Sequence, residues 1–143
     1  MNITKYIESD VNKLIEIWYE GSITAHNFIN KDYWKTQQED MKEKYLPMSE
    51  TYVIRNEKEV VGFASMVDDY LAALFIDVHH QGHGYGKRLL NFVKEHSNTI
   101  QLKVYKKNKN AVNFYLKNGF LISEELIDEP TAEEELLMKW KKV

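Results

Sequence analysis

Three glycines within five residues, at positions 82, 84 and 86, constrain this chain more than any other feature of its sequence. They follow an apolar-rich run at 73–78 and precede a helical pattern that starts at 89. Glycine tolerates tight turns, so several backbone N–H groups can face one point, and a helix start adds partial positive charge there. A strand, a glycine loop and a helix in this order predict a site for a phosphate or pyrophosphate.

Length and composition limit the class of protein. A chain of 143 residues with 43% apolar residues is expected to form one domain, residues 1–143, with a sizeable core. No apolar run approaches the roughly 20 residues of a membrane-spanning helix, and residues 1–6 do not resemble a secretory leader. Without cysteine there is no disulfide, thiolate metal site or cysteine nucleophile. We expect a cytoplasmic protein, as a monomer or weak dimer, with no membrane partner.

Charge is unevenly distributed along the chain. Residues 79–117 hold eight cations and one carboxylate and so carry +7, whereas the whole chain carries −3. This distribution favours a polyanionic ligand beside the glycine loop, although a lysine-rich solvated surface has the same pattern. Because the chain as a whole is negative and lacks a recognised reader motif, no nucleic-acid partner is expected.

Hydrophobic periodicity predicts alternating strands and helices. The positions 11, 14, 15 and 18 mark one face of a helix that Ser9 or Asp10 can cap. Two further helices are predicted at 33–45 and 111–117, and another runs from the glycine loop to about residue 96. The predicted strands are 3–8, 51–55, 60–67, 71–78, 100–105, 120–127 and 136–140. This order indicates an α/β fold whose mixed sheet is parallel in the middle and antiparallel at its ends.

Two familiar phosphate loops do not fit the glycine segment. A nucleotide-hydrolysing loop needs four residues between its first glycine and Gly-Lys, then Ser or Thr, whereas here three residues intervene and Arg88 follows. The dinucleotide fingerprint G-x-G-x-x-G is one residue longer than the segment and belongs near the start of a βαβ unit.

A third signature, Q/R-x-x-G-x-G/A, fits residues 81–86, and a second block follows about 25 residues later. Residues 108–120, NKNAVNFYLKNGF, resemble the N-x-x-A-x-x-F-Y-x-x-x-G-F block of the GNAT (GCN5-related) N-acetyltransferases, and the first block resembles their acetyl-CoA loop. The resemblance covers essentially the whole chain. Residues 22–29 with Tyr33 and Trp34 further resemble small stand-alone bacterial members, some of which acetylate protein lysines. The resemblance to the GNAT family implies a sheet of about six to seven strands flanked by about four helices.

The resemblance also implies which residues bind acetyl-CoA. The glycine loop would hold the pyrophosphate, and the strand before it would pair with the pantetheine amides. The expected cofactor-binding residues are Leu74, Phe75, Ile76, Val78, Gln81, Gly82, His83, Gly84, Tyr85, Gly86, Lys87, Arg88, Asn108, Asn110, Phe114 and Tyr115.

Catalytic roles follow from the same resemblance. The Ile76 N–H would stabilise the oxyanion, and the Tyr115 phenol, with an ordinary pKa of about 10, would return a proton to the leaving thiolate. For the general base, Asp77, Glu20 and His26 remain alternatives. The acceptor-site candidates are His26, Phe28, Trp34, Tyr70 and Asp77, although these aromatic side chains could equally be core.

These features predict direct acetyl transfer from acetyl-CoA to a primary amine, since no cysteine can form an acyl-enzyme. A protein lysine is the expected acceptor. A small amine, a polyamine or an antibiotic is the alternative, and a non-catalytic CoA-binding regulator is a further one. No metal is expected, because His79, His80 and His83 lack a clear fourth ligand.

Overall fold

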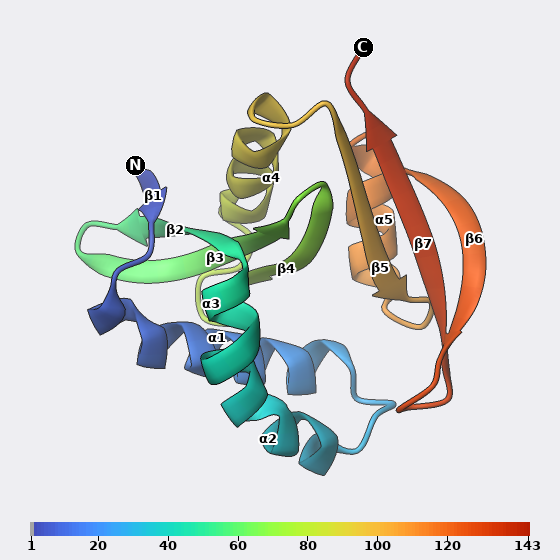
Figure 1. The fold of residues 1–143 in the computed structure, drawn as a ribbon, viewed down its shortest axis with the longest axis horizontal. Helices are drawn as coiled ribbons and strands as arrows, with labels where there is room; N and C mark the ends of the chain where they lie inside the picture. Colours follow the sequence, from blue (N-terminus) through green and yellow to red (C-terminus); the bar gives the residue numbers. More distant parts are fainter. Residues whose placement is uncertain (1) are drawn as a thin grey trace.

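One seven-stranded sheet organises the chain in the computed structural model, which describes residues 2–143 (Figure 1). The strand order is β1-β2-β3-β4-β5-β7-β6. The strands are β1 (Ile3–Lys5), β2 (Glu50–Asn56), β3 (Glu59–Val67), β4 (Tyr70–Ile76), β5 (Thr99–Tyr105), β6 (Leu121–Asp128) and β7 (Glu133–Lys141). Among the strands of residues 2–143, only β4 and β5 pair in parallel. The mixed sheet predicted from the sequence is thus confirmed.

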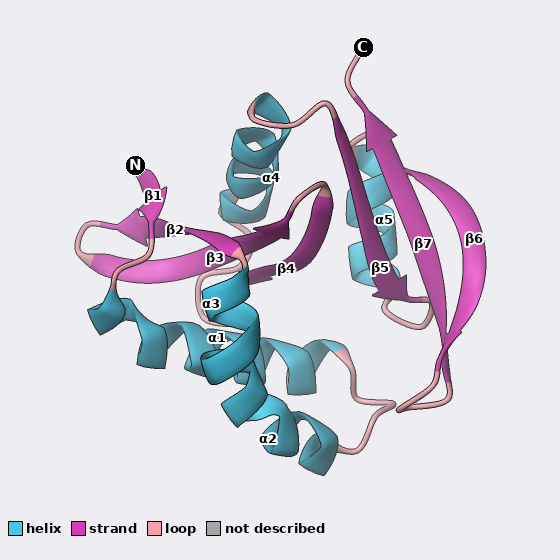
Figure 2. Cartoon of the chain, viewed as in Figure 1, coloured by secondary structure: helices cyan, strands magenta, loops and turns pink. Residues whose placement is uncertain are grey.

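Helices connect and cover the strands (Figure 2). The helical segments are the 3₁₀ turn η1 (Glu8–Asp10), α1 (Val11–Ala25), α2 (Lys31–Asp40), the π turn η2 (Met41–Tyr45), α3 (Leu46–Met48), α4 (Tyr85–Glu95) and α5 (Lys109–Lys117). No helix among residues 2–143 is long and apolar enough to cross a membrane.

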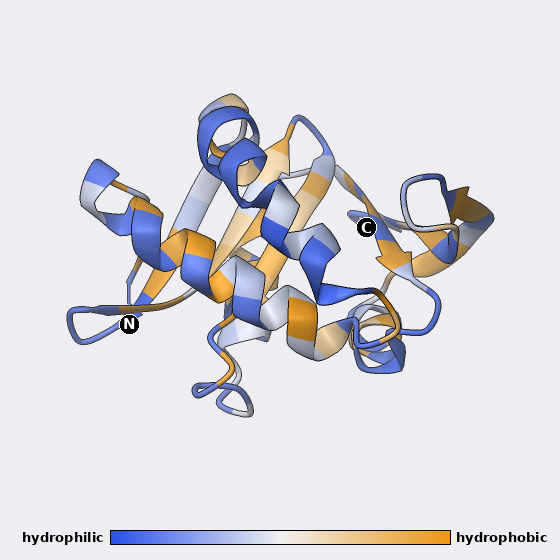
Figure 3. Cartoon of the chain, turned by 90° about the horizontal axis from the view of Figure 1, so that it is seen from below, coloured by the Kyte–Doolittle hydropathy of each residue, from blue (hydrophilic) through white to orange (hydrophobic). Residues whose placement is uncertain are grey.

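Alternating side chains along the strands build a separate core on each face of the sheet. In β2, Val53 packs with α1 and α2, while its neighbour Ile54 packs with α4 and α5. Phe63 and Ala64 of β3 divide in the same way. Figure 3 shows strands that are mostly hydrophobic (orange) behind helices in which hydrophilic (blue) and hydrophobic residues alternate. Period-two alternation therefore places α1 and α2 on one face and α4 and α5 on the other.

The sheet separates between β4 and β5. These strands share one paired position, Tyr70 with Gln101, supported by a hydrogen bond from the Gln101 N–H to the Asp69 carbonyl at 2.9 Å. Beyond that point β5, β7 and β6 incline away from β2, β3 and β4 (Figure 1). Several backbone groups of both strands are therefore left without a strand partner.

Some predicted boundaries were wrong. The strand predicted at 71–78 ends at Ile76, because the Asp77 carboxylate accepts the His79 N–H at 2.9 Å and starts a turn. The strand predicted at 3–8 ends at Lys5. The helix predicted at 33–45 runs from residue 31 to 48 through the π turn, and Pro47 is accommodated near the start of α3.

A buried ion pair fixes α1 against the sheet. The Arg55 guanidinium of β2 donates hydrogen bonds to Asp10 Oδ1 at 3.1 Å and Oδ2 at 2.7 Å, and the Ile7 N–H donates to Oδ2 at 2.9 Å. Burial by itself raises the pKa of Asp10, but these hydrogen bonds and the Arg55 charge outweigh it and lower that pKa below 3.8. Asp10 thus acts through its contact with Arg55 rather than as a side-chain cap of α1.

We predict that Arg55→Met lowers the free energy of unfolding by roughly 2 kcal/mol at neutral pH, because it leaves a buried carboxylate without its charged donor. Since folding lowers the pKa of Asp10, the contribution is present above pH 3.8 and is lost as the pH falls through the lower folded value. Urea unfolding measures both effects. Lys58→Met, which removes an exposed cation from the β2–β3 turn, is the control, and equal stabilities of the two variants would contradict the prediction.

Candidate active site

A cleft of about 860 Å³ occupies the separation between β4 and β5. Its walls come from seven elements of the described chain: α1, α2, β4, α4, β5, α5 and β7. Of the predicted cofactor-binding residues, thirteen line it: Leu74, Phe75, Ile76, Gln81, Gly82, Gly84, Tyr85, Gly86, Lys87, Asn108, Asn110, Phe114 and Tyr115. The other three, Val78, His83 and Arg88, lie outside this lining.

The backbone of β4 presents hydrogen-bonding groups to the cleft. The Asp77 N–H donates to the Val61 carbonyl of β3 at 2.8 Å, so the backbone groups of Phe75 and Asp77 face β3. Because these groups alternate along an antiparallel pair, those of Leu74 and Ile76 face the cleft. The Ile76 carbonyl accepts a hydrogen bond from Gln81 Nε2 at 3.4 Å, which agrees with this orientation. An extended ligand can therefore pair with the free edge of β4.

The glycine loop forms an open cradle of amides. Gly82 and Gly84 have φ values of 84° and 81°, which glycine adopts readily, and a Cβ at either position would meet nothing within 4 Å. Gly84 precedes α4 and its carbonyl accepts the Arg88 N–H at 3.1 Å. The amides of residues 85–87, in the first turn of α4, have no helical acceptor. Together with Lys87 they can bind an anion.

Gly86 differs from the other two glycines of the loop. Its φ is not positive, and a Cβ there would lie 3.6 Å from the Phe114 ring and 3.8 Å from Ile76 Cγ1, which are ordinary van der Waals distances. Neither the backbone conformation nor the packing against α5 and β4 therefore requires glycine at this position. Further positive charge on the cleft comes from Lys103, Lys107 and Lys109.

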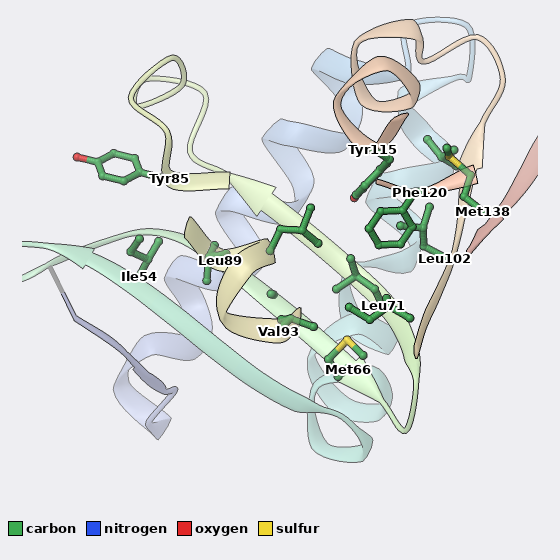
Figure 4. Close-up of a cluster of buried hydrophobic side chains, with 14 of the residues drawn as sticks. Ile54, Met66, Leu71, Tyr85, Leu89, Val93, Leu102, Tyr115, Phe120 and Met138 are labelled. Carbon is green, nitrogen blue, oxygen red and sulfur yellow. The ribbon is translucent and has the colours of Figure 1, made fainter. Parts of the chain in front are cut away.

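Tyr115 extends from α5 into the cleft wall. It is 9% exposed, and its ring packs against Phe114 and Phe120 at centroid distances of 5.3 and 5.5 Å. Figure 4 shows Tyr115 beside Phe120 and Leu102 in the core between the sheet and the helices α4 and α5. Burial raises the pKa of the Tyr115 phenol, so it stays protonated at neutral pH and can act as a proton donor.

His26 connects α1 to the start of α5. Its Nε2 lies 3.3 Å from Asn108 Nδ2, and Asn108 Oδ1 accepts the Ala111 N–H at 3.3 Å as the N-cap of α5. With Oδ1 engaged, the amide nitrogen donates to His26. Burial lowers the pKa of His26 to about 4, so the ring is neutral and can accept this hydrogen bond.

Aromatic side chains surround His26. Trp34 and Tyr105 lie 5.1 and 5.0 Å from its ring centroid, and Phe28 lies at 5.8 Å. His26, Trp34 and Tyr105 line the cleft, whereas Phe28 packs behind them. Tyr70 lies on an adjoining pocket of about 460 Å³ that shares Trp34 with the cleft.

Two of the residues predicted as general bases do not line the cleft. Asp77 is buried, pairs with Lys13 at 3.4 Å and accepts the His79 N–H. Burial by itself raises the pKa of Asp77. The hydrogen bond from the His79 N–H and the nearby Lys13 charge outweigh this effect and lower the pKa, so the Asp77 carboxylate is a poor base. Asp77 was also predicted as an acceptor-site residue, but it is not among the residues that line the cleft. Glu20 lies on α1 between the lining residues Trp18 and Gly21 but does not itself line the cleft.

Two polar residues of the cleft, Tyr105 and Glu135, are not among the predicted site residues. They are paired across β5 and β7, and neither lies in a recognisable motif. Tyr105 Oη donates to Asp128 Oδ2 at 2.9 Å, which ties β5 to the end of β6. The alternation of side chains along β7 could have predicted that Glu135 lies on the opposite face of the sheet from the buried Leu136. The sequence does not show, however, that Glu135 pairs with Tyr105. Within residues 2–143 no group of three or more His, Asp or Glu side chains is arranged to hold a metal ion.

Comparisons with known proteins agree with this geometry. The profile of the acetyltransferase (GNAT) domain matches residues 47–121, which include β2, β3, β4, the glycine loop and α5. The peptidyl-lysine N-acetyltransferase YiaC of Escherichia coli is 29% identical over 133 residues, covering 92% of this chain and 91% of YiaC.

Two solved structures share the fold. The apo-form YjaB structure from Escherichia coli superposes with a TM-score of 0.85 at 24% identity, covering 97% of this chain and 96% of YjaB. The PaiA N-acetyltransferase of Thermoplasma acidophilum, solved in complex with coenzyme A, superposes with a TM-score of 0.82 at 21% identity, covering 99% and 98% of the two chains. Because the GNAT-domain profile matches more than half of its residues, this chain belongs to the GNAT family of acetyltransferases.

Proposed function

We propose that the chain, acting as one domain, transfers the acetyl group of acetyl-CoA directly to the side-chain amine of a protein lysine. The observation that carries this proposal is the cleft between β4 and β5, which has an anion cradle at one end and Tyr115 in its wall. Support for the acceptor comes from the peptidyl-lysine N-acetyltransferase YiaC, which aligns with nine-tenths of the chain.

The donor would be bound by backbone groups as much as by side chains. The amides from Gln81 to Lys87 would hold the diphosphate, and the cleft-facing groups of Leu74 and Ile76 would pair with the amides of the pantetheine arm. Asn110 and Phe114 would contact the arm from α5. Acetyl-CoA supplies an activated thioester, so the protein's part is to orient it and to manage charge and protons.

Two groups would act on the reacting atoms. The Ile76 N–H, on the free edge of β4, would donate a hydrogen bond to the thioester oxygen as negative charge develops on it. The Tyr115 hydroxyl would donate its proton to the departing sulfur. His26, through Asn108, would keep the first turn of α5 in place and so act as a positioning residue for Tyr115.

Thiol release from acetyl-CoA with lysine peptides, polyamines and aminoglycosides tests the acceptor class. A protein lysine acetyltransferase acetylates the peptides, and mass spectrometry locates the product on the side-chain amine. Turnover with only the small amines would identify the alternative function. Acetyl-CoA binding without turnover on any amine would identify a regulator.

We predict that Tyr115→Phe lowers kcat by roughly 100-fold or more, because proton transfer by a positioned side chain contributes about that much. The affinity for acetyl-CoA should change little, since the ring and its contacts with Phe114 and Phe120 remain. Steady-state kinetics and calorimetry separate the two effects. Tyr19→Phe, which removes a hydroxyl outside the cleft, is the control. Unchanged turnover would remove Tyr115 from this role.

We predict that Gly84→Glu weakens coenzyme A binding by about 2 kcal/mol or more, a factor of roughly 30, because the added carboxylate repels the diphosphate. Gly84→Ala is the matched control, since both variants must adopt the same positive φ while alanine adds no charge. Calorimetric titration with coenzyme A compares them. Equal affinities of the Glu and Ala variants would place the diphosphate elsewhere.

A further inference from the structure

The acceptor amine arrives as an ammonium ion and must lose a proton before it can attack. Asp77 and Glu20 lie outside the cleft, and His26 is engaged by Asn108. One carboxylate does line the cleft, that of Glu135 on β7. We propose that Glu135 binds the ammonium group of the acceptor and removes its proton, an inference that rests on the proposed function.

The register of the sheet places Glu135 on the acceptor side. Leu136 and Met138 of β7 belong to the core beneath α4 and α5, so Glu135 projects from the opposite face. Its partner across the β5–β7 ladder is Tyr105, which packs against His26 on that same face. Tyr115 belongs to the other core. A proton acceptor and a proton donor therefore approach the gap between β4 and β5 from its two sides.

The neighbouring glutamates are engaged, and Glu135 is not. Glu133 pairs with Lys107 at 3.1 Å, and Glu134 pairs with Lys106 at 3.6 Å. Glu135 forms no ion pair within the described part of the chain. Its carboxylate is half-buried and remains available to a cation that enters the cleft.

The surroundings of Glu135 suit a base for a lysine arm. The charged groups that face it are Asp128 of β6 and Lys103 of β5, and the tyrosines Tyr33 and Tyr70 also lie near. Burial, and then Asp128, raise the pKa of Glu135, while Lys103 opposes the change. A higher pKa makes the carboxylate a stronger base, and the tyrosine rings offer apolar surface to the methylene groups of lysine.

Glu135 and Tyr115 would each handle one proton of the reaction. An N–H bond of the ammonium breaks and an O–H bond forms on Glu135, which leaves a neutral amine. The amine nitrogen forms a C–N bond to the acetyl carbon, the C–S bond breaks, and the sulfur takes the Tyr115 proton. The second proton of the attacking nitrogen passes to the Tyr115 oxygen, so the products are the amide, the free thiol and one proton on Glu135, which is released to solvent.

Glu135→Gln tests the role, with Glu134→Gln on the same strand as its matched control. With a lysine peptide at pH 7, Glu135→Gln should lower kcat/KM about 100-fold or more, because only a small fraction of lysine is neutral there. The deficit should shrink as the pH approaches 10, where the amine is already neutral. Glu134→Gln should retain the wild-type profile, and both variants should bind coenzyme A as the wild type does.

An acceptor of lower basicity separates proton removal from structural damage. In S-(2-aminoethyl)cysteine a sulfur replaces a methylene of lysine and lowers the pKa of the amine. Glu135→Gln should lose several-fold less activity on a peptide with this residue than on the lysine peptide. Equal losses on both acceptors, or wild-type activity at pH 7, would overturn the role of Glu135. Failure of the wild-type protein to acetylate either peptide would instead overturn the proposed function.

Discussion

The single pairing between Tyr70 of β4 and Gln101 of β5 is the constraint on which the active site depends. Were the two parallel strands paired along their whole length, their inner backbone groups would satisfy one another and leave no room for a ligand. Because pairing stops after one position, the free edge of β4 can bind an extended ligand by strand addition. The protein thus leaves hydrogen bonds unmade inside its own sheet, and those are the groups that we propose bind the donor.

The separation of β4 from β5 needs other contacts to maintain it, because two half-sheets that share one paired position could otherwise move closer together or farther apart. Two cores, one on each face of the sheet, each contain residues of both β4 and β5 and so connect the two strands to the helices on that face. At the open end, the hydrogen bond between Asn108 and His26 and the packing of Tyr105 on the His26 ring connect α1 to the β5–α5 turn. The width of the cleft is therefore set by contacts on both of its walls.

What the sequence could predict was local. The glycine loop, the apolar strand before it and the block from Asn108 to Phe120 are contiguous, so their placement follows from short-range order along the chain. Asp77 and Glu135 show the limit. Asp77 is adjacent to the cofactor strand and so looked catalytic, yet the next turn directs it to Lys13. Glu135 reaches the cleft only through the register of β5 with β7, which depends on contacts 30 residues apart in sequence.

The uneven charge seen along the chain acquires a spatial meaning in the fold. The cations Lys87, Lys103, Lys107 and Lys109 line the cleft together with the free amides of α4, and Glu135 of β7 lines it as well. A donor with a diphosphate and an acceptor with an ammonium group carry opposite charges, so a cleft that offers both cations and a carboxylate can bind both. The excess of cations among the lining residues favours the diphosphate, which is a reason for a net-negative protein to concentrate its cations in one segment.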